Sequence, residues 1–294
     1  MAAARRDLDL FFSPLSVVPW FLDIPKVVTV HDLGFLRFPQ IQPVKYRWYW
    51  QAALRRSVRV ADRIIGVSES TSQDIIELLD GDPKRVKVVH EAVNPFFFEE
   101  SERDEEFRLL NALCLQSPFI LTVGTVEPRK NYSAVLKAFT RVQQQRPDVQ
   151  VVIVGSPGWL SEDIAYLIRR RRNVHWLDDA DDGTLRVLYR NAAVFLFPSL
   201  YEGFGLPVLE AMACGTPVIT SDAGSLPEVA GDAALYVSAE DCVGIADAAL
   251  RVLNDSALRE DYVAKGRENV RRFLWRDSAQ KTWQAFDEAI AGRA

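Results

Sequence analysis

The chain has 294 residues, of which 48% are apolar and 26% are charged, and its formal net charge is −5. This length fits two domains of about 150 residues, and the ordinary composition excludes disordered and collagen-like chains, while the acidic balance gives no general sign of nucleic-acid binding. The three cysteines are far apart and form no CxxC pair, which excludes a disulfide framework or zinc ribbon and favours a reducing, cytoplasmic compartment.

The amino-terminal segment comes nearest to a membrane or secretory sequence. Residues 8–22 are mostly apolar, but Asp9 and two prolines interrupt them, and they are too short to span a bilayer. Arg5 and Arg6 resemble the start of a secretory signal, although no small-x-small cleavage site follows. The favoured alternative is a buried strand over 8–12 followed by a loop.

The first half of the chain predicts an α/β domain with too few strands. Apolar runs predict strands over 8–12, 27–30, 63–67 and 86–89, and helices over 44–60 and 70–79. A Rossmann-like domain usually holds about six strands, and only about four fit here. The first domain is therefore expected to be incomplete, as if the chain started in its middle.

The predicted helix over 44–60 carries a basic and aromatic patch. Residues 45–50 read KYRWYW, and the same helix contains three arginines, Arg55, Arg56 and Arg59. Such a helix can lie on an anionic membrane. It can equally be a core-packed amphipathic helix with a solvated basic face, and the sequence leaves both interpretations open.

An acidic run, followed by regular strand–helix alternation, opens the second half. Residues 99–117 hold the acidic run and the expected domain boundary, because such runs are usually solvated linkers or helix faces. Beyond it we predict strands over 119–123, 149–154, 174–177, 193–197, 217–220 and 233–237, and helices over 132–145, 182–191, 207–214 and 241–253. These strands lack a period of two, which is typical of a parallel sheet buried on both faces. A doubly wound sheet binds ligands at the carboxyl ends of its strands.

The segment that carries most chemistry follows the fourth of these strands. Gly203 and Gly205 precede a predicted helix, and Pro207 suits its first turn. Glycines there expose backbone N–H groups beside the positive end of the helix dipole, which suits a phosphate. Glu202 and Glu210 flank the loop, and carboxylates accept hydrogen bonds from sugar hydroxyls. The alternative is a plain strand–loop–helix corner whose glutamates favour the helix dipole.

This segment, PSLYEGFGLPVLEAM over 198–212, resembles the signature of the family 4 glycosyltransferases of the GT-B fold. Further matching segments are spread over nearly the whole chain: TVHD at 29–32, ADRIIGVS at 61–68, VGTVEPRKN at 123–131, LPEV at 226–229 and WRDSA at 275–279. The resemblance implies an α/β GT-B-like fold with two Rossmann-like doubly wound domains facing a cleft, the first incomplete. The implied division is 1–110 on the acceptor side, 111–274 for the nucleotide sugar, and 275–294 as a crossover helix packing toward the first domain.

The resemblance also implies the reaction. A sugar would pass from a nucleotide-diphosphate sugar, best guessed as GDP-mannose, to a cell-surface glycan or lipid-linked acceptor in polysaccharide biosynthesis, with retention of configuration. A GT-B-type epimerase or phosphorylase is the alternative enzyme, and a truncated or split chain that needs a partner or a missing segment is the alternative state. The expected location is cytoplasmic, with peripheral contact at the inner face of the membrane as an open option.

The resemblance assigns roles to particular residues. Glu210 would hold the ribose hydroxyls, Glu202 would face the transferred sugar, and the preorganised cations Arg129 and Lys130 would neutralise the leaving diphosphate. The remaining donor-binding residues are Gly124, Gly203, Phe204, Gly205 and Leu206, and His31 and Asp32 would contact the donor sugar or acceptor. The alternatives are a solvated loop at 129–130 and a structural histidine at 31. Thr125 stands where many relatives carry arginine, and Arg129 is expected to supply that charge.

No metal or other cofactor is expected. Asp179 and Asp181 form an Asp-x-Asp triplet, but aspartates at that place cap helices and occupy turns, and a lone triplet lacks further oxygen ligands for Mg²⁺ or Mn²⁺. His90 and His175 are interpreted as ordinary strand positions.

Overall fold

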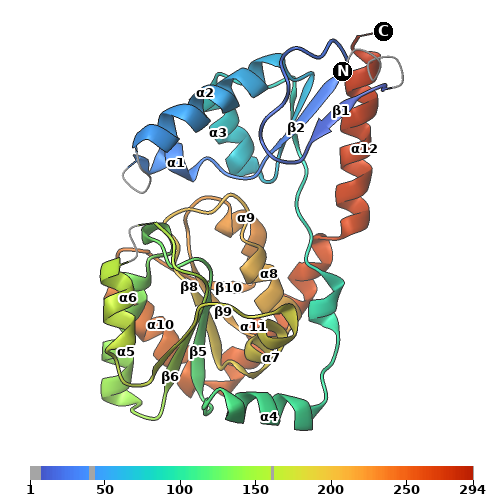
Figure 1. The fold of residues 1–294 in the computed structure, drawn as a ribbon. Helices are drawn as coiled ribbons and strands as arrows, with labels where there is room; N and C mark the ends of the chain where they lie inside the picture. The colour runs from blue at the N-terminus through green and yellow to red at the C-terminus, as the bar shows by residue number, and fades with distance from the viewer. Residues whose placement is uncertain (1–7, 40–43, 160–161, 294) are drawn as a thin grey trace. The chain divides into compact units, whose positions relative to one another are not determined.

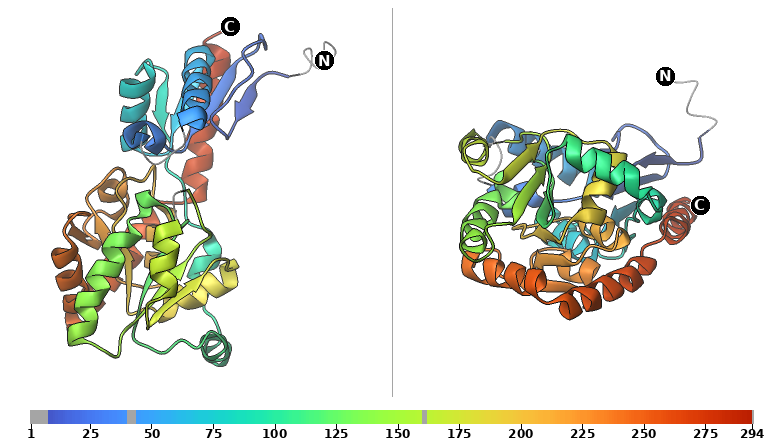
Figure 2. Two further views of the ribbon diagram at one scale, coloured as in Figure 1. Left: turned by 60° about the vertical axis from the view of Figure 1, so that its left-hand side comes forward. Right: turned by 90° about the horizontal axis from the view of Figure 1, so that it is seen from below.

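A computed structural model describes residues 8–39, 44–159 and 162–293, with side chains from residue 47 onward in the second range. The arginines of the secretory alternative, Arg5 and Arg6, lie outside the described residues. By their backbone contacts the residues form two compact units: Met1–Ala92 with Glu202–Phe204 and Phe273–Ala294, and Val93–Tyr201 with Gly205–Arg272. Figures 1 and 2 show both units.

The first unit is built on a four-stranded parallel sheet. Its strands lie in the order β1-β2-β3-β4, with bounds Phe11–Ser13, Lys26–Val30, Arg63–Gly66 and Val86–Val88. The predicted number of strands in this half is confirmed. The prediction of a strand over 8–12 is wrong at both ends, because only Phe11–Ser13 pairs with β2, from Phe11 opposite Lys26 to Ser13 opposite Val28.

Helices cover both faces of this sheet. They are α1 (Gly34–Arg37), α2 (Val44–Val60), α3 (Glu69–Leu79) and α12 (Trp275–Ala291). Val28 on one face of β2 packs in a core with α2 and α3, whereas Val27 on the other face packs against Ala285 and Ala289 of α12. Figure 1 shows α12 running along the sheet. Because β2 is buried on both faces, its apolar run has no period of two.

Helix α2 packs in the core along one side and is exposed along the other. Leu54 and Val58 are buried in the core of the first unit. Trp48 and Tyr49 are 65% and 67% exposed. The interpretation as an amphipathic, core-packed helix is therefore confirmed, and contact of its exposed face with a membrane stays a prediction.

The second unit is built on a six-stranded parallel sheet in the order β10-β9-β8-β5-β6-β7. The strands, in chain order from β5 to β10, are Phe119–Val123, Gln150–Val154, Val174–Leu177, Val194–Phe197, Val218–Ser221 and Ala234–Val237. The chain winds outward from β5 to β7, then returns to pair β8 with β5 and winds the other way. The sheet is therefore doubly wound, as predicted, with its switch point between β5 and β8.

Helices lie on both faces of this second sheet (Figure 2). They are α4 (Arg103–Ala112), α5 (Tyr132–Gln145), α6 (Glu162–Arg169), α7 (Asp182–Asn191), α8 (Leu206–Ala213), α9 (Leu226–Ala230), α10 (Cys242–Asn254) and α11 (Ser256–Asn269), with 3₁₀ turns η3 (Pro95–Phe98), η4 (Pro128–Lys130) and η5 (Val270–Arg272). Val194 and Leu196 of β8 pack with α5 and α10, whereas Phe195 meets Tyr189 of α7 on the opposite face. Each unit is thus a sheet of parallel strands covered by helices, which confirms the predicted α/β fold class.

Four helices of the second unit, α4, α6, α9 and α11, are not among the predicted helices. Helix α6 buries only Ile168, and α11 buries only Gly266 and Asn269. Helix α4 buries no residue, so neither it nor α11 presents a clear apolar stripe. Helix α6 packs Ile164 and Ile168 on the core, but it has only eight residues, and α9 has only five, so each is too short for a helical period to be recognised. Within the described ranges, none of the helices is both long and apolar enough to cross a membrane.

Candidate functional site

The switch point of the second sheet brings two predicted donor-site segments together. Gly124 directly follows β5, Pro198 directly follows β8, and these two strands are neighbours in the sheet. The backbone at Gly155, which follows β6, lies close to that at Gly124, so a Cβ added at Gly155 would lie 2.0 Å from the carbonyl oxygen of Gly124. Crevices at such switch points are where open α/β sheets bind ligands.

Lys130 lies against this edge of the sheet. A Cβ added at Gly124 would lie 3.4 Å from Nζ of Lys130, and the same Nζ lies 4.7 Å from the ring centroid of Phe197, the last residue of β8. The ammonium is therefore placed at the carboxyl ends of both β5 and β8. A fixed positive charge at this place can stabilise an anionic group.

Arg129 is largely occupied by contacts with its own unit. Its Nε and Nη2 lie 3.0 and 2.9 Å from Oε1 of Glu127, and Nη1 donates to the Tyr201 carbonyl at 3.0 Å. Its side chain is 15% exposed. Arg129 therefore ties the loop after β5 to the loop after β8, and Glu127 already balances much of its charge.

Asn131 is a residue of this loop that sequence reasoning missed. It adopts a left-handed backbone conformation, with φ of 59°. Its Nδ2 donates to the carbonyl of Pro198 at 3.0 Å and to that of Ala239 at 2.7 Å. Asn131 ends the segment VGTVEPRKN just before a predicted helix, and this position, which suits an asparagine in the left-handed conformation, could have indicated its role.

Glu210 lies inside α8, one turn after the glycine loop. Gly205, with φ of 113°, precedes the helix, and Gly215, with φ of 79°, follows its carboxyl-terminal cap residue Cys214. The hydroxyl of Tyr189 on α7 donates to Oε2 of Glu210 at 3.0 Å. Burial raises the pKa of Glu210 to about 7, against the lowering effect of the Tyr189 hydrogen bond.

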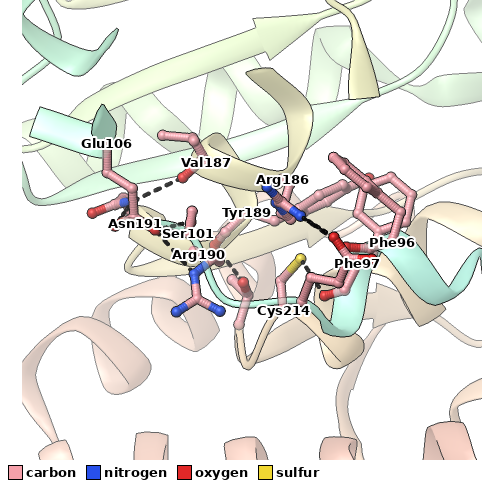
Figure 3. A network of polar contacts seen from close by, with 12 residues as sticks. Phe96, Phe97, Ser101, Glu106, Arg186, Val187, Tyr189, Arg190, Asn191 and Cys214 are labelled. Carbon is pink, nitrogen blue, oxygen red and sulfur yellow. Dashed lines mark hydrogen bonds and ion pairs between the residues drawn. The ribbon is translucent and has the colours of Figure 1, made fainter. Parts of the chain in front are cut away.

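A polar network holds α7, the helix that bears Tyr189, in place (Figure 3). Glu106 of α4 accepts hydrogen bonds from Nε of Arg190 at 3.0 Å and from Nδ2 of Asn191 at 3.1 Å. One turn earlier on α7, the Arg186 guanidinium lies 3.9 Å from the Phe96 ring centroid and donates to the Phe96 carbonyl at 3.2 Å. Segment 93–112 thus packs on the helix that orients Glu210.

Three residues of the glycine loop, Glu202–Phe204, belong to the first unit. The carbonyl oxygen of Gly203 accepts hydrogen bonds from Oγ of Ser68 at 2.6 Å and Oγ1 of Thr71 at 3.0 Å. A Cβ at Gly203 would lie 1.9 Å from the carbonyl oxygen of His31, so only glycine fits. The structure therefore places this loop beside His31, and Glu202 is buried there.

His31 forms a pair that the sequence did not reveal. Its Nδ1 lies 2.8 Å from Oε1 of Glu91, and its Nε2 lies 2.7 Å from the carbonyl oxygen of Pro14. A carbonyl only accepts, so Nε2 must carry a proton, and an ionised Glu91 requires one on Nδ1 as well. The hydrogen bond to Glu91 raises the pKa of His31, which favours the imidazolium.

Asp32 combines a local structural contact with a place in a pocket. Its Oδ1 accepts a hydrogen bond from the backbone N–H of Gly34 at 3.0 Å, at the start of α1. A pocket of ≈ 190 Å³ in the first unit is lined by both predicted residues and by an aromatic side chain of α2; its residues are Ser16, His31, Asp32, Phe35, Trp50 and Leu54. Trp50 is 40% exposed. Hydroxyl-accepting groups beside an aromatic ring are suited to a sugar.

Comparison with known proteins decides the family. Residues 104–269 match the family described as glycosyl transferases group 1, and residues 2–96 match glycosyltransferase family 4. The chain is 32% identical over 291 residues to an O-antigen chain mannosyltransferase B of Escherichia coli, covering 97% of this chain and 76% of that protein. The chain belongs to the group 1 glycosyltransferases. The predicted family and enzyme class are confirmed.

Solved structures confirm the GT-B fold of this glycosyltransferase. A sucrose-phosphate synthase from Thermosynechococcus elongatus has a TM-score of 0.81 at 24% identity, covering 99% of this chain and 76% of that one. HepE from Anabaena, solved with UDP-glucose, has a TM-score of 0.79 at 17% identity, covering 97% and 79%.

The other predicted polar groups of the glycosyltransferase have structural contacts. Oδ1 of Asp181 accepts a hydrogen bond from the Thr184 N–H at 2.7 Å and so caps α7, the helix-capping role expected from the sequence. His175 lies on β7 beside Gln150, with a nitrogen-to-nitrogen distance of 3.0 Å, and burial lowers its pKa. Among the side chains that the structure describes, no cluster of three or more His, Cys, Asp or Glu could hold a metal ion.

His90 differs from its predicted place on a strand. It follows β4 rather than lying in it, and its ring packs 6.0 Å from that of Phe204 and 5.5 Å from that of Phe273. Phe204, predicted to bind the donor, is thus part of an aromatic cluster of the first unit. His90, Phe204 and Phe273 are far apart in the chain, so no local sequence pattern could predict that their rings pack together.

Proposed function

We propose that the protein is a retaining, metal-independent glycosyltransferase that uses a nucleotide-diphosphate sugar. The observation that carries the proposal is the β5–β8 switch point, where the Lys130 ammonium lies against Gly124 and Phe197, in the same unit as the glycine start of α8. Such an edge suits a diphosphate through a cation, exposed backbone N–H groups and a helix dipole.

The donor would lie with its diphosphate at this edge. Transfer breaks the bond from the anomeric carbon to a diphosphate oxygen and forms one to an acceptor oxygen, whose proton is released. Lys130, supported by Arg129, would stabilise the charge on the departing diphosphate in place of a metal ion. Glu210, oriented by Tyr189, would accept hydrogen bonds from the ribose hydroxyls.

The first unit would supply the groups that face the sugars. Glu202 would hold hydroxyls of the transferred sugar, and His31 and Asp32 would orient the acceptor. The pocket beside Trp50 fits this assignment, because a half-exposed indole offers an apolar face next to the hydroxyl-accepting Asp32. We propose a growing cell-surface glycan or a lipid-linked glycan as the acceptor.

The donor sugar is proposed to be mannose, carried on GDP. The support is the similarity to the Escherichia coli O-antigen mannosyltransferase at 32% identity. The similarity in fold to HepE, solved with UDP-glucose, makes UDP-glucose the donor to compare. Selectivity between these donors depends on a few pocket hydrogen bonds.

A transfer assay tests the proposal. The full chain is incubated with radiolabelled GDP-mannose or UDP-glucose, mannose oligosaccharides as acceptors, and either Mg²⁺ or EDTA. We expect a labelled oligosaccharide whose new linkage has the donor's α configuration by NMR, at the same rate in EDTA. An inverted linkage, a rate abolished by EDTA, or isomerised free donor would contradict it. Nucleotide binding without transfer would favour the alternative of a chain that needs a partner or further segment.

A cytoplasmic location with peripheral membrane contact is also proposed. Its support is the exposed side of α2, where Trp48 and Tyr49 are 65% and 67% exposed. Vesicle sedimentation tests it, because a Trp48→Ser, Tyr49→Ser double variant should bind anionic vesicles several-fold more weakly. Equal binding would remove the role of this helix.

A further inference from the structure

The first unit holds a second pocket at the opposite end of its strands from His31. This pocket of ≈ 560 Å³ is lined by residues where β2 and β3 begin, Lys26 and Arg63, and by Arg85 just before β4. Arg59, near the end of α2, and Arg293, after α12, complete its cationic lining. Five cations from five segments of the chain therefore converge on one pocket.

The carboxylates of this pocket do not balance these cations. Asp62 is already occupied, because its Oδ1 accepts from Nε of Arg293 at 2.7 Å and its Oδ2 accepts from the backbone N–H of Lys26 at 2.8 Å. Asp23, the other carboxylate in the lining, has a side chain that is 97% exposed and lies 3.5 Å from Nη1 of Arg293. Arg63 and Arg85 pair with carboxylates outside the lining, Glu288 at 2.9 Å and Asp82 at 3.7 Å. Among the described residues, Lys26 and Arg59 are therefore the cations of this pocket without an ion pair.

Two of the cations have unused capacity to bind an anion. The Arg59 guanidinium forms no hydrogen bond or ion pair with the residues that the structure describes. Lys26 is only 3% exposed, and its Nζ donates to the carbonyls of Leu22 at 2.7 Å and Ile24 at 3.1 Å. An ammonium has three N–H groups, so one of them remains to donate to an anion. Burial and, to a smaller extent, the nearby Arg293 lower the pKa of Lys26, against the raising effect of Asp62 and Asp23.

We propose that this pocket binds a phosphate group, from either a phospholipid headgroup or a free phosphate ester. Guanidinium forks match phosphate oxygens, and a buried ammonium adds a fixed point charge. The rim carries Trp20, which is 61% exposed and whose ring centroid lies 4.5 Å from the Arg56 guanidinium carbon. This site is separate from the donor site of the second unit and does not depend on the proposed transfer reaction.

Titration of the full chain with inorganic phosphate, at constant ionic strength, tests this site through the melting temperature. The test variant is Arg59→Glu, and the matched control is Arg55→Glu, one turn earlier on α2, whose Nη2 donates to the Leu78 carbonyl at 3.3 Å and which does not line the pocket. We expect phosphate to stabilise wild type and control alike and its apparent Kd to rise at least tenfold in Arg59→Glu. Arg59→Ala should give a smaller rise.

An equal response of Arg59→Glu and Arg55→Glu, or no response of the wild type, would overturn the proposal. Equal responses would mean that phosphate binds elsewhere, including the diphosphate edge of the second unit. Melting temperatures without phosphate establish that both variants fold.

Vesicle binding then distinguishes the two sources of phosphate. Sedimentation with phosphatidylglycerol vesicles is compared with phosphatidylcholine vesicles. If phosphatidylglycerol binding falls tenfold in Arg59→Glu but not in Arg55→Glu, the site holds a lipid headgroup. If only the response to inorganic phosphate differs between the variants, the site is supported for a soluble phosphate ester.

Discussion

At the scale of single residues, Glu210 couples the proposed donor site to pH. Its folded pKa of about 7 lies above the ordinary 4.5, so its contribution to stability is fully present below about pH 4.5 and is lost as the pH rises through 7. Glu210→Gln stays neutral and can still accept the Tyr189 hydrogen bond. We expect it to stabilise the protein by about 1–3 kcal/mol near pH 8 and to have little effect near pH 5, by urea denaturation. A variant less stable than wild type at both pH values would contradict this.

His31 depends in the same way on Glu91. The hydrogen bond between them is the largest cause of its raised pKa, so the stability that His31 contributes is present below about pH 6.5 and is lost as the pH rises through the folded pKa. Glu91→Gln should lower the pKa of His31 toward its ordinary value in an NMR titration. His175, whose pKa burial lowers, should keep its titration and serves as the internal reference. An unchanged His31 curve would show that Glu91 does not hold the imidazolium.

At the scale of elements, the part of the glycine loop that belongs to the first unit has no room for a side chain at Gly203. A Cβ at Gly203 would lie 1.9 Å from the His31 carbonyl oxygen and 2.6 Å from Cβ of Asp32. Gly203→Ala should therefore displace this backbone, destabilise the protein by about 1–3 kcal/mol and lower transfer activity at least tenfold. The control is Gly183→Ala, whose Cβ would meet only Oδ1 of Asp181 at 3.6 Å. Thermal unfolding and initial transfer rates are the measurements. Equal effects of the two substitutions would contradict the tight backbone contact at Gly203.

Most elements could be predicted from the sequence because their apolar residues face a core. Apart from the first strand and the end of the crossover helix, predicted strands and helices such as 119–123 and 132–145 begin and end within one residue of those observed. Helices α4 and α11 could not be predicted because they bury almost nothing, and α6 and α9 because they are too short to show a helical period. Local patterns indicated the glycine loop and Lys130, since strand ends and helix starts are local features. The pairs His31–Glu91 and Glu210–Tyr189 join residues far apart in the chain, so no local pattern could reveal them.

At the scale of the whole molecule, the two parallel sheets divide the work of the proposed reaction. The second unit carries the doubly wound sheet with its switch point and the groups assigned to the nucleotide. The first unit carries His31, Asp32 and the loop with Glu202, which are assigned to the sugars. Donor binding by the second unit is therefore the central claim, because every assigned role depends on it.

The melting temperature of the full chain with GDP, UDP, ADP or CDP tests that claim most directly. One nucleotide, at about a hundred times its Kd, should stabilise the wild type by about 2.7 kcal/mol. Lys130→Ala should lose most of this effect, whereas Arg129→Ala, whose charge Glu127 already balances, should retain more of it. A well-folded wild type that no nucleotide stabilises, or a stabilisation that persists unchanged in Lys130→Ala, would contradict the account.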